Sequence, residues 1–412
     1  MLVRLLVLSV IIGLIDLYFF QAVKTVSQGL AVSQRNLLYG IYWSVVAFEV
    51  LFGYVYLFLP AEGYKWFKLY AASTIFILVA SKAIGVLSLL ADDAGRLLIY
   101  LWSLANPESA NAKPGGMARA AFLSKMAIIT AGIPIGVFGY GMLRGAFNFT
   151  IRNQKISVNG LPEEFVGLRI VQISDIHIGS FVTREPLKRV ASMIAELAPD
   201  LVLFTGDLVN NKADETMGYE DILNSIQAPM GVYSVFGNHD YGDYVPWNSQ
   251  KEKRENLERL MKVQADAGWK LLLNEHVILE KDGAKLALIG VENWSSKMRF
   301  PRYGQLDKAT QGMEDTPLKL LMSHDPSHWN AEVTSAYKDI DITFSGHTHG
   351  MQFGVEIPGI QWSPVQYVYK QWAGLYSEHN QHLYVNRGLG VLGFMGRVGM
   401  PPEITVIELE RA

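Results

Sequence analysis

Hydrophobic residues are concentrated in the first third of the chain. Three apolar stretches, residues 37–59, 69–90 and 126–143, contain no more than one charged residue each. Each stretch is long enough to cross a hydrocarbon layer about 30 Å thick as a helix. We therefore predict three membrane-spanning helices in this part of the chain.

A fourth apolar stretch covers residues 2–20 and allows two interpretations. It could be a fourth span, or it could be the hydrophobic region of a cleaved signal peptide. Asp16 interrupts the apolar run and argues against a signal peptide. With this stretch counted as a span, we predict an all-α bundle of four transmembrane helices over residues 1–145.

Three charged residues, Asp16, Glu49 and Lys82, lie inside the predicted spans. A charge that faces lipid costs several kcal/mol, so we expect these side chains to turn inward or to pair. They could mark a path for transport or for a lipid head group, or they could simply join packed helices. Lysines and arginines flank both sides of the spans equally, so the positive-inside rule does not predict sidedness.

After Arg144 the pattern changes to short β-rich runs separated by helical stretches. This alternation is typical of layered α/β domains, and we predict one over residues 146–412. Helices are expected at residues 185–197 and 251–267. Strands are expected at residues 168–174, 201–205, 232–236, 286–291, 318–323 and 340–345.

Composition excludes several classes of function. The formal net charge is −3, and the second half of the chain has no run of lysine or arginine, so a nucleic-acid partner is not expected. The sequence contains no cysteine. A disulfide framework, a thiolate nucleophile and a cysteine-based zinc site are therefore all excluded.

Polar side chains follow five of the six expected strands. Because ligands gather beyond the carboxyl ends of strands in α/β sheets, we expect these side chains to converge. They are Asp175 and His177 after the first strand, Asp207 after the second, Asn238, His239 and Asp240 after the third, His324 after the fifth, and His347 and His349 after the sixth.

The candidate donors are carboxylates, imidazoles and an amide, without sulfur. This mixture suits Mn, Fe or Zn. Seven donors exceed the need of one tetrahedral ion, whereas two ions about 3.5–4 Å apart that share one carboxylate would use them all. Two such cations lower the pKa of a water held between them toward about 7 and neutralise phosphoryl oxygens, which favours cleavage of phosphate esters.

The order of the motifs D-x-H, G-D, G-N-H-D, a lone His and G-H-T-H resembles the calcineurin-like metallophosphoesterase superfamily over roughly residues 165–410. The resemblance implies a four-layer α/β/β/α sandwich. It also implies a bridging role for Asp207 and a catalytic role for His239 over the scissile phosphate, although His239 could instead pack in the turn. The implied ligands are Asp175, His177 and His349 for one metal and Asn238, His324 and His347 for the other.

Two motifs depart from the protein Ser/Thr phosphatase branch of that superfamily. Here they read GDLVNNK and FGNHD, so the phosphate-gripping arginines are missing and Asn210 replaces the aspartate that orients the catalytic histidine. Protein phosphatase activity is therefore not expected, and the orientation of His239 is left open. Asn210 and Asp240 are candidates for contacts to the ligands or to the substrate.

A narrower resemblance is carried by residues 168–179 (LRIVQISDIHIG), 321–329 (LMSHDPSHW) and 387–404. These segments resemble transmembrane metallophosphoesterases, a group whose relatives include UDP-2,3-diacylglucosamine pyrophosphatases. The resemblance implies an enzyme of the plasma or inner membrane that cleaves a phosphodiester or pyrophosphate bond of a lipid-linked substrate. The alternatives are a catalytically idle receptor or scaffold, and a transporter regulated by a phosphoesterase-like domain.

Some residues outside the motifs have two interpretations. Arg387 and Arg397 could bind a phosphate bidentately or form structural ion pairs. The aromatic residues that follow the last motif could line an acyl or membrane-facing pocket, or they could pack in the core; these are Trp362, Tyr367, Tyr369 and Trp372. The remaining histidines are expected to be exposed or to pack; these are His328, His379 and His382.

Overall fold

The computed structural model describes residues 2–59, 64–106, 116–297 and 299–412. The chain divides into two compact units. One comprises Met1–Leu143 with Gly393–Met395, and the other comprises Arg144–Leu392 with Gly396–Ala412.

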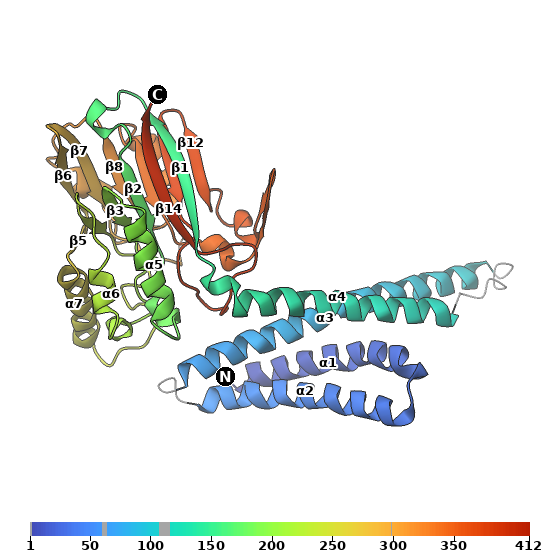
Figure 1. Cartoon of the computed structure of the whole chain (residues 1–412). Helices are drawn as coiled ribbons and strands as arrows, with labels where there is room; N and C mark the ends of the chain where they lie inside the picture. The colour runs from blue at the N-terminus through green and yellow to red at the C-terminus, as the bar shows by residue number, and fades with distance from the viewer. Residues whose placement is uncertain (1, 60–63, 107–115, 298) are drawn as a thin grey trace. The chain divides into compact units, whose positions relative to one another are not determined.

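The first unit is built from four long helices, each long and apolar enough to cross a membrane. The predicted all-α bundle of four spans is therefore confirmed (Figure 1). The helix α3 has 41 residues and is about 60 Å long, so it continues well beyond the apolar stretch that predicted it. The bounds are α1 Leu2–Val26, α2 Val32–Phe58, α3 Lys65–Ala105 and α4 Gly116–Leu143.

The charged residues inside the spans pair with one another. Lys82 Nζ lies 2.5 Å from Asp16 Oδ1 and 2.6 Å from Glu49 Oε2, and all three side chains are buried. Tyr42 OH donates a hydrogen bond of 3.0 Å to Asp16. Since these residues come from α1, α2 and α3, they join three helices, which confirms that the charges turn inward.

The second unit contains two six-stranded sheets, both mixed. The first has the order β1-β14-β2-β3-β4-β5 and the second β12-β13-β9-β8-β7-β6. In the first sheet the bounds are β1 Thr150–Val158, β2 Arg169–Ile173, β3 Leu201–Phe204, β4 Val232–Ser234, β5 Trp269–Leu271 and β14 Glu403–Arg411. In the second they are β6 Glu275–Lys281, β7 Ala284–Gly290, β8 Lys319–Met322, β9 Ile342–Ser345, β12 Gly374–Glu378 and β13 Gln381–Val385.

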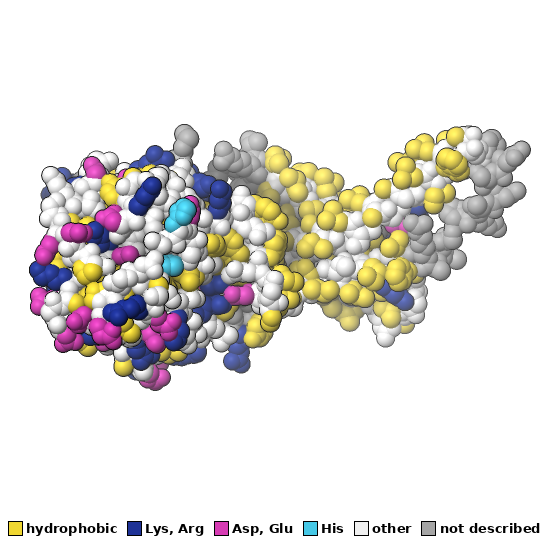
Figure 2. All heavy atoms as spheres, turned by 90° about the horizontal axis from the view of Figure 1, so that it is seen from above, with side chains coloured by type: hydrophobic (Ala, Val, Ile, Leu, Met, Phe, Trp, Pro, Cys, Tyr) yellow, Lys and Arg dark blue, Asp and Glu magenta, His cyan; other side chains and the backbone are white. Residues whose placement is uncertain are grey.

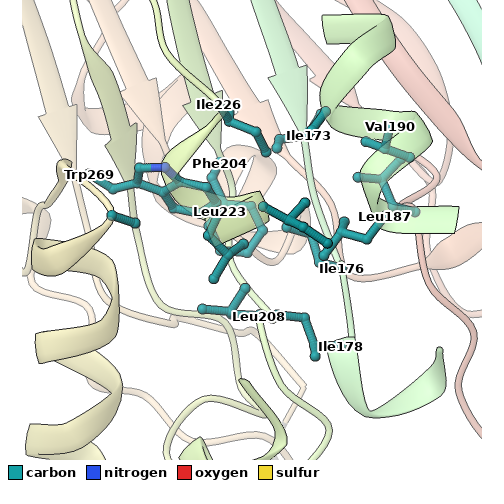
Figure 3. Packing of buried hydrophobic residues seen from close by; sticks show 14 of the residues in the cluster. Ile173, Ile176, Ile178, Leu187, Val190, Phe204, Leu208, Leu223, Ile226 and Trp269 are labelled. Carbon is teal, nitrogen blue, oxygen red and sulfur yellow. The ribbon is translucent and has the colours of Figure 1, made fainter. Parts of the chain in front are cut away.

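The sheets pack face to face because side chains alternate along the strands. In β2, Ile170 packs in the cluster between the sheets with Leu320 and Phe344 of the second sheet. Val171 and Ile173 point to the other face, where they meet α5 (Glu185–Glu196), α6 (Glu220–Asn224) and α7 (Gln250–Asp266) (Figure 3).

Short helical segments cover the outer face of the second sheet. The segments α8 (Leu306–Thr310) and η7 (Trp329–Val333) pack on it through Leu306, Trp329 and Val333. The layers therefore run α/β/β/α, which confirms the predicted sandwich. In Figure 2, charged side chains gather over this unit, while the surface of the helices is mostly hydrophobic.

Candidate metal centre

The expected ligands lie in loops at the carboxyl ends of the strands. Asp175 follows β2, Asp207 follows β3, Asn238 follows β4, His324 follows β8 and His347 follows β9. Neighbouring loops are joined by backbone hydrogen bonds, such as the 2.9 Å bond from the N–H of Asp175 to the carbonyl of residue 206. The parallel strands therefore bring motifs that are far apart in sequence to one edge.

The first group of donors is formed by Asp175, His177 and His349. One ligand atom of each lies within 4.8 Å of the others, and all three side chains are buried. His349 Nε2 is 3.1 Å from Asp175 Oδ1 and 3.1 Å from His177 Nε2. These are the three residues expected to hold one cation.

The second group is formed by Asp207, His324 and His347, again within 4.8 Å of one another. His324 Nε2 lies 3.2 Å from Asp207 Oδ2 and 3.2 Å from His347 Nδ1. The same oxygen of Asp207 is also 3.6 Å from His177 Nε2 in the first group. Asp207 therefore lies between the two groups, as a shared ligand must.

Asn238 supplies an oxygen that is buried and free. Its side-chain Nδ2 donates a 2.8 Å hydrogen bond to Tyr244 OH, which fixes the amide orientation. Its Oδ1 has no hydrogen-bond partner within the part of the chain that the structure describes. A buried acceptor without a partner lowers the stability of the fold. The site is therefore suited to a group that this oxygen can bind, such as a cation.

The spacing of the imidazole nitrogens fits divalent cations. Two nitrogens that bind one cation at about 2.0–2.1 Å and about 100° lie about 3.1–3.2 Å apart. The nitrogen pairs of His177 with His349 and of His324 with His347 are 3.1 Å and 3.2 Å apart. With oxygen donors beside them and no sulfur, these residues fit Mn, Fe or Zn.

Hydrogen bonds outside the cluster select the nitrogen that faces inward. His324 Nδ1 donates to the carbonyl of Thr205 at 2.7 Å, so its Nε2 is the nitrogen that faces the cluster. His347 is turned the other way, because its Nε2 donates to Tyr369 OH at 2.9 Å and its Nδ1 faces His324. Tyr369 in turn donates to Asp325 at 3.2 Å.

Burial and mutual charge set the protonation of the ligands. Burial lowers the pKa of His177 to about 3, so this imidazole is neutral at pH 7. Burial opposes ionisation of Asp207, but His324 and His239 outweigh it and hold the pKa of Asp207 well below its usual range. Burial also lowers the pKa of His324, yet Asp207 outweighs it and raises this pKa to about 10. A positive charge beside Asp207 is therefore strongly favoured.

His239 is oriented by the backbone rather than by a side chain. Its Nδ1 donates a 2.7 Å hydrogen bond to the main-chain carbonyl of Asn210, and its backbone N–H donates to Asp207 Oδ1 at 2.8 Å. Its ring packs on Tyr244, with centroids 4.6 Å apart. His239 is partly exposed, as is the expected ligand His347.

Asp240 holds two of the motif loops together. Its carboxylate accepts hydrogen bonds of 2.8 Å from the N–H groups of Asp207 and Leu208, and one of 2.9 Å from residue 237. Burial, followed by the charge of Asp207, raises the pKa of Asp240 to about 7. Asp240 therefore contacts the backbone of the site and positions it.

Two family models match the chain. Residues 3–146 match "Probable Calcineurin-like phosphoesterase, transmembrane domain", and residues 168–351 match "Calcineurin-like phosphoesterase". The "Uncharacterized metallophosphoesterase YkuE" of Bacillus subtilis is 30% identical over 303 residues, which cover 71% of this chain and 98% of that protein. The chain belongs to the calcineurin-like metallophosphoesterase family.

The chain is also similar to a transmembrane metallophosphoesterase and to a named pyrophosphatase. A "Transmembrane protein with metallophosphoesterase domain" of Danio rerio is 32% identical over 293 residues, or 69% of this chain and 62% of that protein. The match therefore spans less than two thirds of the zebrafish protein. The "UDP-2,3-diacylglucosamine pyrophosphatase LpxG" of Chlamydia muridarum is 27% identical over 300 residues, covering 60% of this chain and 86% of LpxG.

Family membership confirms the predicted enzyme class. This metallophosphoesterase is a phosphoric ester hydrolase of a family that uses divalent metals, and it is a multi-pass integral membrane protein. Residues 3–20 lie within the transmembrane family model and in the helix α1, which favours a fourth span over a cleaved signal peptide.

The two arginines considered for phosphate binding in this metallophosphoesterase are held by protein groups. Arg387 pairs with Glu403 at 2.5 Å and with Glu356 at 2.9 Å. Arg397 is buried, donates to the carbonyl of residue 390 at 2.6 Å, and lies 3.2 Å from His349 Nδ1. These contacts favour the structural interpretation for both side chains.

The aromatic residues after the last motif do not form one cluster. Tyr369 and Trp372 are buried in a small core, whereas Tyr367 is exposed. Tyr369 has a role that core packing does not describe, since its hydroxyl contacts the ligand His347. His328 packs as expected, because it is buried and bonded to Ser323.

Three contributors to the site were not predicted from sequence. They are Tyr244, Asp325 and Gly388, which contact Asn238, Tyr369 and Asp175 respectively. Gly388 has φ of +75°, and a Cβ there would lie 2.7 Å from Asp175 Cβ, so only glycine fits. Of these three residues, only Asp325 could have been suspected from the sequence, because it directly follows the expected ligand His324.

Proposed function

We propose that this metallophosphoesterase uses two divalent cations to hydrolyse a phosphodiester or pyrophosphate bond of a lipid-linked substrate. The observation that carries the proposal is the position of one oxygen. Asp207 Oδ2 lies 3.2 Å from His324 Nε2 and 3.6 Å from His177 Nε2, between the two donor groups. A carboxylate so placed is the natural bridge of a two-metal site.

The remaining ligands divide between two cations. Asp175, His177 and His349 would hold one, and Asn238, His324 and His347 the other. When bound, the cations would lower the pKa of a water molecule and neutralise the phosphoryl oxygens. The protein's part is to fix the donors, which it does through the hydrogen bonds of Thr205, Tyr369 and Asp240.

His239 would protonate the leaving oxygen. Its Nδ1–H is engaged by the carbonyl of Asn210, so Nε2 is the nitrogen that can carry a proton to the substrate. Its backbone N–H is bonded to Asp207, which holds the ring beside the donor cluster. General acid catalysis of this kind contributes about 10²–10⁴ in rate.

The membrane connection supports a lipid-linked substrate. Gly145 lies two residues after the end of α4 and packs so tightly on the carbonyl of Arg397 that a Cβ there would overlap it. Arg397 is itself 3.2 Å from His349. Gly145, just beyond the last span, and the expected ligand His349 therefore both contact Arg397. The pyrophosphatase name of the LpxG relative agrees with this substrate class.

The proposal is tested with the full chain in detergent, stripped of metal and then reloaded with Mn²⁺. We expect chelation to abolish hydrolysis of both a soluble aryl phosphodiester and a UDP-diacylglucosamine-type diphosphate, and metal to restore it. Asp207→Ala should lose about 10² or more in rate, and Glu280→Ala, an exposed position on β6, should not change it. Hydrolysis that survives chelation would refute the metal mechanism. Activity on the soluble ester alone would refute the lipid-linked substrate.

A further inference from the structure

A small hairpin in the second unit has two chemically different faces. It consists of β10 (Val355–Ile357) and β11 (Ile360–Trp362), paired antiparallel. Val355 is opposite Trp362 and Ile357 is opposite Ile360, whereas Glu356 is opposite Gln361. Because side chains alternate along a strand, the four hydrophobic residues share one face and the two polar residues share the other.

The hydrophobic face is uncovered and continues onto the next turn. Val355 is 44% exposed, and Ile357 and Ile360 are both 54% exposed. Tyr367 is 77% exposed and accepts a 3.4 Å hydrogen bond from Trp362 Nε1, and Val368 beside it is 50% exposed. We call six residues the apolar hairpin face; they are the exposed Val355, Ile357, Ile360, Tyr367 and Val368 and the partly exposed Trp362. Single exposed hydrophobic residues are ordinary, but a contiguous patch marks an interaction site.

The polar face prevents the hairpin from turning its hydrophobic side inward. Glu356 accepts hydrogen bonds from Arg152 at 3.0 Å and from Arg387 at 2.9 Å. Arg387 is only 1% exposed and also pairs with Glu403. These ion pairs, one of them to the buried Arg387, fix the hairpin on the domain with the apolar hairpin face outward.

The bilayer is within reach of this face by chain connectivity alone. Arg152, which holds Glu356, is nine residues after Leu143, the last residue of α4. Nine residues span at most about 32 Å even when fully extended. The anchor of the hairpin therefore cannot lie farther than this from the end of a membrane span.

The composition of the face matches the interfacial layer of a membrane. Aliphatic side chains supply the apolar contact, while Trp362 and Tyr367 are the residue types enriched where hydrocarbon meets water. The face also lies close in sequence to the donor cluster. The short helix that begins at the ligand His349 ends at Gln352, three residues before the hairpin begins at Val355. Tyr369, which directly follows Val368, contacts the ligand His347.

We propose that the apolar hairpin face inserts into the interfacial layer of the lipid bilayer. The occupant is lipid, and neither metal binding nor catalysis is required for the insertion. The proposal therefore goes beyond the catalytic function, and its failure would leave that function untouched.

The absence of cysteine makes a direct test possible, since one introduced thiol is the only site of labelling. We would prepare Ile360→Cys and Gln361→Cys in the full chain, label each with an environment-sensitive fluorophore, and reconstitute them in phosphatidylcholine–phosphatidylglycerol vesicles. Gln361 is the matched control, because it is adjacent and lies on the opposite face. Glu280→Cys on β6 gives the signal of an exposed position away from the hairpin.

We expect the label at position 360 to be quenched by doxyl-labelled phosphatidylcholine and several-fold less by aqueous iodide than labels at 361 and 280. Equal iodide quenching at all three positions would overturn the proposal. Protection of position 360 from both quenchers would also overturn it, because the face would then be covered by protein, such as a second copy of the chain. If Ile360→Cys does not fold, Ile357→Cys on the same face replaces it.

Discussion

Five of the seven expected metal ligands have a left-handed backbone conformation. This conformation costs an L-residue about 1–2 kcal/mol relative to the usual regions. Such strain persists only where the surrounding structure holds it, and it gathers at functional sites. The five φ values are 48° at Asp175, 45° at His177, 61° at Asp207, 72° at His347 and 52° at His349.

The strain can be measured at His177, where two substitutions remove the same ligand. His177→Ala keeps a Cβ at φ 45°, whereas His177→Gly does not. We expect the glycine variant to be more stable by about 1 kcal/mol in the free energy of unfolding of metal-free protein. Chemical denaturation of the full chain in detergent measures this difference.

The control for that comparison is Ala191→Gly, inside the helix α5. Glycine should lower stability there by about 0.5–1 kcal/mol. If glycine were equally unfavourable at position 177, the turn after β2 would not be strained.

The role of His239 can be separated from that of Asn210. The main-chain carbonyl of Asn210 accepts the hydrogen bond that orients His239, so Asn210→Ala should leave this hydrogen bond in place. We expect Asn210→Ala to retain most of the hydrolysis rate and His239→Ala to lose about 10²–10⁴. Steady-state rates on a soluble phosphodiester give both values, and a loss of equal size in the two variants would show that the Asn210 side chain acts instead.

Residue types predicted the donors but not the contacts that hold them. The sequence indicates Asp207 and His324 because carboxylates and imidazoles in this order suit metals. It cannot indicate that Asp240 accepts from four backbone N–H groups, or that a carbonyl orients His239. Those contacts depend on loop conformation, which is set by how neighbouring strands bring the loops together.

At the scale of elements, four of the strands that were predicted are buried on both faces, whereas the buried β13 and β14 were missed. β2, β3, β8 and β9 are covered by helices on one side and by the other sheet on the other side, so they read as continuous apolar runs. β1 was not predicted, because it lies at the edge of its sheet and its exposed residues alternate with partly exposed or buried ones. Edge strands lack the apolar run on which the prediction depends.

The helix α3 shows a related limit. Hydropathy predicted only residues 69–90, yet the helix continues to Ala105. In the extension, Arg96 pairs with Asp92 one turn earlier at 2.7 Å. This pair supports the helix across the charged interruption at residues 92–96, beyond which residues 97–104 are again mostly apolar.

The ion pairs among the first three helices should matter for the stability of the bundle. Lys82→Met leaves the carboxylates of Asp16 and Glu49 buried without their partner. We expect it to cost about 3–5 kcal/mol in the free energy of unfolding, because an unpaired buried charge is strongly destabilising. Unfolding of the full chain in mixed detergent micelles measures the change.

The triple variant Asp16→Leu, Glu49→Leu, Lys82→Met is the matched control, because it removes all the charges together. It should recover most of the lost stability, since apolar replacements of a whole buried ion group are often neutral. A Lys82→Met variant as stable as the wild type would mean that the charges do not hold the helices together.

At the scale of the whole molecule, the change in hydrophobic pattern near Arg144 predicted a membrane part and an α/β part. The structure has a helical unit and a two-sheet unit on either side of this position. The sandwich and the enzyme class followed from the resemblance of the motifs to the calcineurin-like metallophosphoesterase superfamily. The substrate could not be predicted in the same way, because the motifs consist of residues expected to bind metal and not of residues that would select a lipid or a nucleotide.

The number of metal ions per chain tests the two-cation site most directly. Full-length protein would be stripped, reloaded with Mn²⁺ or Zn²⁺, freed of excess metal and measured by elemental analysis against protein concentration. We expect two ions per chain in the wild type and in His239→Ala, which removes no ligand, and fewer in Asp207→Ala. A wild-type protein that hydrolyses phosphodiesters with one ion or none per chain would contradict the shared-ligand site around Asp207.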